Sequence, residues 1–140
     1  MAGPNEKIVR RVAEVLNTCK SVDEAIATGV EELWDPEIEF VNPEDAVERG
    51  TRKGAAGMRT VLENFLAGAG TGATLELEEL QERGDHVFTL YRVHIRGAAS
   101  GIETLGPPVG SVYTFRDGRI LRIEWHYDVD MARASYEQGG

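Results

Sequence analysis

Two basic side chains at alternating positions are the first feature of this sequence that could do chemistry. Arg92 and His94 lie two residues apart in a segment that alternates like a β-strand, which puts both on one face. Imidazole is the side chain whose unperturbed pKa lies nearest neutrality, so a histidine in an apolar cavity could accept a proton. We therefore predict that His94 acts as a proton acceptor and that Arg92 receives developing negative charge.

The direction in which this pair points is open at the level of sequence. Its face of the strand begins apolar, at Phe88 and Leu90, and turns polar towards Arg92 and His94. Either the strand leaves the core there and shows both side chains to water, with Arg92 paired to an acid such as Glu103, or both point into a cavity that has polar groups at its floor.

An apolar, aromatic face and a charged face alternate along the last predicted strand, residues 120–128. The first face must lie inside the protein, and the second faces outward. His126 and Asp128 could be two metal ligands, but no third ligand accompanies them, so we interpret this face as solvated or as an interface. The apolar set is Leu121, Ile123, Trp125 and Tyr127, and the charged set is Arg122, Glu124, His126 and Asp128.

Composition and motifs argue against several classes of function. The net charge of −9 disfavours nucleic acid and anionic membranes as partners. No apolar run is long enough to span a membrane. The sequence contains none of the phosphate-binding glycine motifs or zinc motifs, so we predict no cofactor and no metal. A single cysteine, Cys19, and a start without the apolar segment of a secretion signal predict a cytoplasmic protein.

Helices are predicted in the first half of the chain, where they must support the later strands. A helical stripe runs to about Cys19, and a second helix begins at Ser21, whose hydroxyl caps it, and continues to the stop at Asp35-Pro36. A short strand at residues 38–42 is followed by a loop with one small strand, and a third helix ends in the glycines at 68–72.

Strands dominate the second half. From residue 73 the apolar period changes from 3.6 to 2, which predicts long antiparallel strands. Asp117-Gly118 supplies the positive φ angles of a tight hairpin. Helices followed by a meander predict an α+β fold in which N-terminal helices pack on one face of a curved antiparallel sheet.

Four segments together resemble one known family. They are LWDPEIEFVNP, GTRKGAAGMRTVLENFL, RVHIRGAASGIET and VYTFRDGRILRIEWHYD. Over nearly the whole chain they are similar to the SnoaL-like branch of the nuclear transport factor 2-like superfamily, a branch of small bacterial proteins. The resemblance implies a single SnoaL-like domain over residues 1–140, a cone-shaped cystatin-like roll that encloses a largely apolar pocket, and a homodimer formed through the sheet.

The same resemblance implies which residues form the site. By similarity to ketosteroid isomerase, the base position falls on Asn42 and the oxyanion-binding acid falls near Ser111; neither is a carboxyl group, so that steroid mechanism is not expected. By similarity to limonene-epoxide hydrolase, Arg92 and His94 face the pocket. The predicted substrate-binding residues are Trp34, Phe40, Asn42, Ser111, Tyr113, Ile123, Trp125 and Tyr127.

We therefore expect a cofactor-independent acid/base enzyme of the isomerase, polyketide cyclase, dehydratase or epoxide hydrolase type that acts on a small, mostly apolar molecule. The alternative is a non-catalytic small-molecule-binding or dimerising protein of the same fold. If the outer face of the last strand packs on a second copy, Arg122, Glu124 and His126 must pair across a two-fold axis, and we predict such a homodimer.

Overall fold

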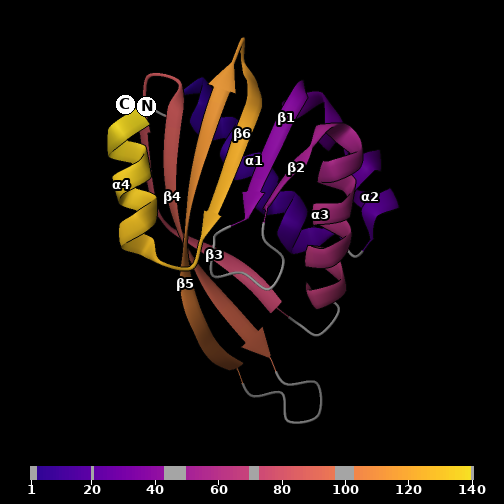
Figure 1. Cartoon of the computed structure of the whole chain (residues 1–140). Coiled ribbons are helices and arrows are strands. Elements are labelled where there is room, and N and C mark those ends of the chain that lie inside the picture. The colour runs from indigo at the N-terminus through magenta and orange to yellow at the C-terminus, as the bar shows by residue number, and fades with distance from the viewer. Residues whose placement is uncertain (1–2, 20, 43–49, 70–72, 97–102, 140) are drawn as a thin grey trace.

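The computed structural model describes residues 3–19, 21–42, 50–69, 73–96 and 103–139 of the chain. Figure 1 shows a sheet with helices on both of its faces. None of the helices in these ranges is long and apolar enough to span a bilayer. The elements are α1 (Pro4–Thr18), α2 (Val22–Ala27), the 3-10 helix η1 (Val30–Leu33), β1 (Trp34–Asn42), β2 (Gly50–Lys53), α3 (Gly54–Ala69), β3 (Ala73–Arg83), β4 (His86–Arg96), β5 (Glu103–Arg116), β6 (Arg119–His126) and α4 (Val129–Gly139).

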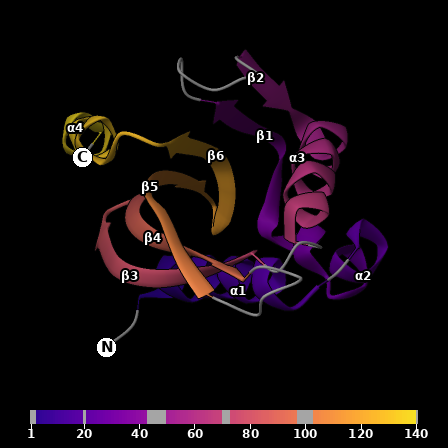
Figure 2. The ribbon, with the colours of Figure 1, turned by 90° about the horizontal axis from the view of Figure 1, so that it is seen from below.

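Six strands within these ranges form one curled sheet, in the order β2-β1-β6-β5-β4-β3. Its concave side faces α1 and α3, as the view from below shows (Figure 2). This confirms the predicted α+β class and the cone-shaped roll with N-terminal helices on the concave face. Neighbouring strands are antiparallel except β1 and β6, which are parallel. A purely antiparallel sheet was expected, but the chain between β1 and β6 is long enough for the crossover that a parallel pair needs.

The second helix is shorter than the sequence predicts. Ser21 Oγ accepts a hydrogen bond from the Glu24 N–H at 3.1 Å and caps α2, as expected. The expected continuation to Asp35-Pro36 is wrong, because Gly29 adopts a φ of +87° and ends the helical path. Strand β1 therefore begins at Trp34, and its proline lies where the pairing with β6 shifts register.

The hairpin between β5 and β6 confirms the turn prediction. Asp117 and Gly118 have φ angles of 54° and 78°, as a primed two-residue turn requires. Strand β5 starts at Glu103 and runs through the Pro107-Pro108 pair. The register with β4 shifts beside these prolines, which accommodates residues that have no N–H to donate.

Helix α4 follows the last predicted strand and was not expected. It packs on the outer, convex face of the sheet (Figure 1), where Ala132 and Tyr136 cover Phe88 and Val112. Gly110 makes this close approach feasible, since a Cβ there would lie 2.5 Å from the Ala132 Cβ. The apolar start of the face that carries Arg92 and His94 is therefore buried by a helix on the outside and not by the interior of the cone.

Candidate functional site

Four hydroxyl groups gather on the concave face of β4 and β5. Thr89 lies opposite Ser111 in the strand register, and the phenol oxygens of Tyr91 and Tyr113 are 2.8 Å apart across the same pair of strands. All four residues are at most 1% exposed. Because side chains two residues apart share a face, the alternation of the two strands places this hydroxyl cluster, defined here as Thr89, Tyr91, Ser111 and Tyr113, inside the cone.

The two phenols are held in their neutral form. Burial raises the pKa of Tyr91, and burial together with the neighbouring Tyr91 phenol raises the pKa of Tyr113 well above its ordinary value. In the hydrogen bond between the two phenols, one phenol donates its proton and the other accepts it. The proton of the accepting phenol is therefore available to a further acceptor. The pair can therefore donate a hydrogen bond to an oxygen placed beside it.

The other two hydroxyls have unmet hydrogen-bonding capacity. Within the described part of the chain, Ser111 Oγ and Thr89 Oγ1 are buried and have no hydrogen-bond partner of acceptable geometry. A buried hydroxyl without a partner costs roughly 1–3 kcal/mol. Such groups persist where a ligand or water supplies the partner, which makes the Ser111 side of the cluster a place for a bound oxygen.

Aromatic side chains border the cluster. Trp125 stacks on Tyr91 with a ring-centroid distance of 5.8 Å and an interplanar angle of 25°, and Phe40 lies 6.5 Å from Trp125 by the same measure. Trp125, Phe65 and Val93 belong to the interior cluster and are nevertheless partly exposed. The buried hydroxyl cluster is thus bordered by apolar, aromatic side chains, of which Trp125 is partly exposed.

Most of the predicted substrate-binding residues lie on this concave face. Ser111 and Tyr113 belong to the hydroxyl cluster, Trp125 and Phe40 border it, and Ile123 is buried opposite Tyr113 in the register. Trp34 is in the same core, at the start of β1. The Asn42 side chain lies outside the described residues.

The structure places Arg92 and His94 on the outer face of the sheet. His94 Nε2 lies 2.6 Å from the Glu76 carboxylate and Arg92 Nε lies 3.0 Å from that of Glu78, both on β3. The inward orientation that the resemblance implied is therefore wrong. Its physical reason is the parity of β4: Tyr91 points inward, so its neighbours in sequence point outward.

Two members of the apolar set on the last strand also depart from the expected face. Tyr127 is 49% exposed, because β6 ends at His126 and the chain turns into α4. Leu121 lies on the outer side, since the register with β5 shifts between Thr114 and Phe115 and Ile120 takes the buried position.

The charged face of the last strand carries no metal site within the described residues, where no three His, Cys, Asp or Glu side chains come together as ligands. Asp128 instead accepts hydrogen bonds from the N–H groups of Asp130 and Met131 at the start of α4. His126 Nε2 lies 3.2 Å from Glu124 Oε1.

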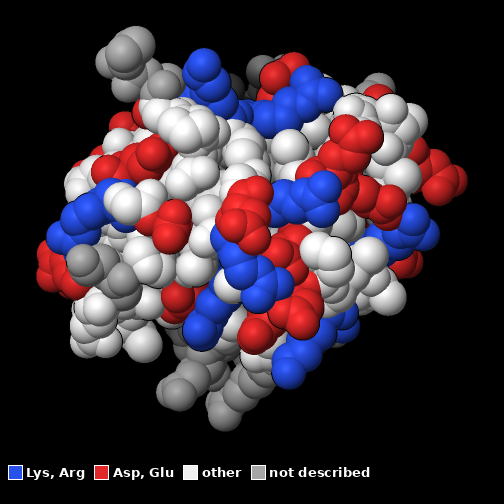
Figure 3. All heavy atoms as spheres, turned by 90° about the horizontal axis from the view of Figure 1, so that it is seen from above, with Lys and Arg blue, Asp and Glu red and all other residues white. Residues whose placement is uncertain are grey.

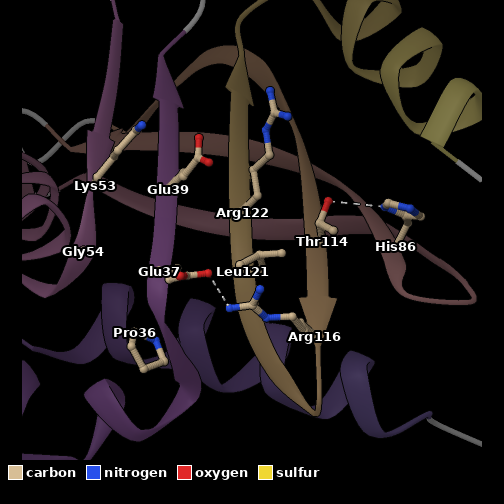
Figure 4. Close-up of a pocket in the computed structure, with 10 residues that line it drawn as sticks. All are labelled: Pro36, Glu37, Glu39, Lys53, Gly54, His86, Thr114, Arg116, Leu121 and Arg122. Carbon is tan, nitrogen blue, oxygen red and sulfur yellow. Dashed lines mark hydrogen bonds and ion pairs between the residues drawn. The ribbon is translucent and has the colours of Figure 1, made fainter.

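An open groove of about 820 Å³ lies on the outer face of the sheet (Figure 4). The hydroxyl cluster lies on the opposite face, because His86 and Thr114 alternate with its members along β4 and β5. The groove is mixed in charge and is partly floored by Pro36 and Leu121. Arg116 is held there by Asp35, with two hydrogen bonds of 2.8 and 3.0 Å, and by Glu37. The remaining lining residues are Glu39, Lys53, Gly54, His86, Thr114 and Arg122.

Two members of the hydroxyl cluster were missed by the sequence interpretation. Thr89 and Tyr91 lie on the opposite face of the strand from Arg92 and His94, and no role was predicted for them. The signal that could have found them is that Thr89 and Tyr91 carry hydroxyls on a face of the strand that is otherwise aliphatic. In the structure these two residues lie beside Ser111 and Tyr113 on the neighbouring strand.

Comparisons with known proteins agree with this geometry. Three solved structures are similar over most of the chain. Bal32a from a soil-derived mobile gene cassette has 21% identity and a TM-score of 0.67, covering 96% of this chain and 97% of its own. TerC, co-crystallised with polyporic acid, has 25% identity and a TM-score of 0.62, covering 97% and 99%. SalBIII, an epoxide hydrolase/cyclase-like enzyme in pyran ring formation in polyether salinomycin, has 17% identity and a TM-score of 0.62, covering 86% and 87%.

No curated protein matches the sequence. A family model does: the SnoaL-like domain matches residues 9–123, which is most of the chain and includes every strand up to the middle of β6. This match shows that the chain belongs to the SnoaL-like family.

Proposed function

We propose that this protein is a cofactor-independent enzyme of the isomerase, cyclase, dehydratase or epoxide hydrolase type, acting on a small, mostly apolar molecule at the concave face. The hydroxyl cluster carries the proposal, because it sets neutral hydrogen-bond donors at the base of an apolar, aromatic surface. Membership of the SnoaL-like family and the likeness to the epoxide hydrolase/cyclase-like SalBIII support this range of reactions.

The cluster would act on an oxygen that gains negative charge during the reaction. Tyr91 and Tyr113 have one phenol proton to offer beyond their mutual bond, and Ser111 has a second hydroxyl without a partner. Fixed donors in a site that excludes water stabilise such charge more strongly than water does. Trp125 and Phe40 would contact the apolar part of the molecule.

A panel of small epoxides, unsaturated ketones and linear polyketones tests the proposal by turnover. Tyr113→Phe and Tyr91→Phe remove only the hydroxyls, and we expect each to lower turnover by about 10²- to 10³-fold, as loss of one charge-stabilising donor does. Tyr136→Phe is the matched control, because Tyr136 belongs to α4 and packs on the other side of the sheet. Turnover that survives both interior substitutions would contradict the proposal.

The catalytic roles of His94 and Arg92 stay predictions from the sequence. His94→Gln in the same assay tests them, because loss of a general base lowers turnover by about 10²- to 10⁴-fold. Wild-type turnover in this variant would contradict the predicted role of His94 as the base and would fit its contact with Glu76 on the outer face.

Binding without turnover is the second candidate function. The unpartnered Ser111 and Thr89 hydroxyls favour it as much as they favour catalysis, since they require a bound oxygen and no reaction. A ligand that binds wild-type protein, loses affinity in Tyr113→Phe and is recovered unchanged would identify a carrier.

From the family resemblance we further propose a bacterial, cytoplasmic homodimer.

A further inference from the structure

Helix α4 packs directly behind the strand segments that carry the hydroxyl cluster. Thr89 and Ser111 face each other across β4 and β5 on the concave side. The next register pair along the same two strands is Phe88 and Val112, whose side chains point to the convex side. This is the side that carries α4 (Figure 1), and the helix covers both residues. The contact of α4 and the hydroxyl cluster are therefore the two faces of one stretch of sheet.

The approach between α4 and β5 is closest beside the cluster. Gly110 immediately precedes Ser111, and a Cβ at Gly110 would lie 2.5 Å from the Cβ of Ala132. Ala132 and Phe88 are both 0% exposed, so no free volume separates the helix from the sheet here. Close-packed interiors accommodate added volume by moving backbone. A displacement of α4 at this point is therefore transmitted to the strand positions that carry the hydroxyls.

Polar contacts with β3 hold the other side of the helix. Arg133 donates hydrogen bonds of 2.5 and 3.3 Å to the Glu79 carboxylate, and its guanidinium lies 4.7 Å from the centre of the Phe88 ring. Arg83 donates a hydrogen bond of 3.2 Å to the carbonyl oxygen of Glu137. These contacts hold Phe88 between the helix and the sheet, one residue away from the hydroxyl of Thr89.

The apolar contact of α4 is a small unit of its own. The buried residues beneath the helix form a cluster separate from the larger interior cluster, to which Tyr91 and Tyr113 belong. Segments with few buried apolar contacts open at a lower free energy than the main core does. The helix can therefore open from the sheet while the interior of the cone stays folded.

We infer that α4 is a positioning element for the hydroxyl cluster. Docking of Ala132 against Gly110 and Phe88 sets the arrangement of β4 and β5 that brings the two phenol oxygens to 2.8 Å and presents Ser111 to a ligand oxygen. Ala132 and Phe88 are positioning residues that touch no ligand. The inference rests on the function proposed above, and it makes ligand binding on the concave face and docking of α4 on the convex face coupled equilibria.

Ala132→Leu tests this coupling, because it enlarges a buried side chain of α4 and leaves every residue of the sheet unchanged. Calorimetry gives the affinities for α-tetralone and tetralin, which differ by one carbonyl oxygen. We expect wild-type protein to prefer the ketone by at least about fivefold, as one net hydrogen bond provides. We expect Ala132→Leu to bind both probes within about twofold, since the hydroxyls lose their arrangement while the apolar surface remains.

Ala25→Leu is the matched control. Ala25 is also 0% exposed, but it lies on α2, which packs against α3 and η1. The substitution adds the same volume to a different helix, and the preference for the ketone should stay at the wild-type value.

Hydrogen exchange in wild-type protein tests the same coupling without a substitution. Coupling between two equilibria is reciprocal, so a ketone that binds better when α4 is docked must also favour docking. At saturation, α-tetralone should slow exchange of the amides in residues 129–139 by about the fivefold ratio of affinities. Tetralin should leave their exchange within about twofold of the free protein.

A ketone preference that persists in Ala132→Leu, a loss of preference that Ala25→Leu shares, or exchange in residues 129–139 that α-tetralone does not slow would each overturn this inference and leave the proposed function standing. Equal affinities of wild-type protein for the two probes would contradict the inference together with the proposed function.

Discussion

Side chains on the two faces of the sheet have different surroundings, because successive residues of β4 point to opposite faces. Sequence reasoning identified Ser111 and Tyr113 because a resemblance placed them near a pocket, but it could not decide the parity of β4. The sequence did not reveal that α4 packs on the outer face and buries Phe88 there. A buried apolar residue on the outer face resembles a residue that points into the core. Arg92 and His94 follow Phe88 on that outer set; their direction was open from the residues, and the resemblance implied the inward orientation.

At the residue scale, Asp35 anchors the outer groove and links stability to pH. Its hydrogen bonds with the Arg116 guanidinium, and then with the Glu37 N–H, hold the pKa of this carboxyl below its ordinary value. A carboxyl whose pKa is lowered on folding adds stability above its unfolded pKa, and this stability is lost as pH falls through the folded pKa.

We therefore expect Asp35→Asn to lower the free energy of unfolding in urea at pH 7, and we expect this deficit to be smaller at pH 3, below the ordinary pKa of the carboxyl. Glu14→Gln, an exposed carboxyl on α1, should match wild type at both values. An Asp35→Asn deficit that is the same at pH 3 and pH 7 would show that the stabilisation does not depend on the charge.

At the element scale, the helices and strands were predictable where local signals decide them. The Ser21 cap and the Asp117-Gly118 turn depend on residues within a few positions, and both are present. The parallel pairing of β1 with β6 and the docking of α4 depend on contacts between distant segments. The sequence of residues 129–139 contains no local signal that this segment packs on the outer face of the sheet.

Gly110 is the element-scale test, because it sets the distance between β5 and α4. Gly110→Val should lower the free energy of unfolding by about 1–3 kcal/mol, since the added Cβ collides with Ala132. Hydrogen exchange in residues 129–139 should rise selectively. Adding Ala132→Gly to this variant should recover part of the loss, and a single variant with unchanged exchange in α4 would contradict the close packing.

At the scale of the whole molecule, the curled sheet gives the protein two unlike surfaces. Its concave side is an apolar interior with four hydroxyls, and its convex side is charged where α4 leaves it bare. The surface seen from above mixes basic and acidic side chains closely, without one extended field of either sign (Figure 3). The charged side chains that give the net charge of −9 thus lie mainly on the surface, and the residues of the hydroxyl cluster are uncharged.

The central claim is that the concave face binds a ligand that carries an oxygen atom more tightly than the same ligand without it. Calorimetric binding of two matched probes tests this claim most directly. The α-tetralone and tetralin molecules share one skeleton and differ by a carbonyl oxygen. We expect wild-type protein to bind the ketone at least about fivefold more tightly, as one net hydrogen bond provides. Ser111→Ala should bring the two affinities within about twofold, while Ser135→Ala, on the outer face, should leave the preference unchanged. Equal affinities in the wild type, or a preference that persists in Ser111→Ala, would contradict the claim.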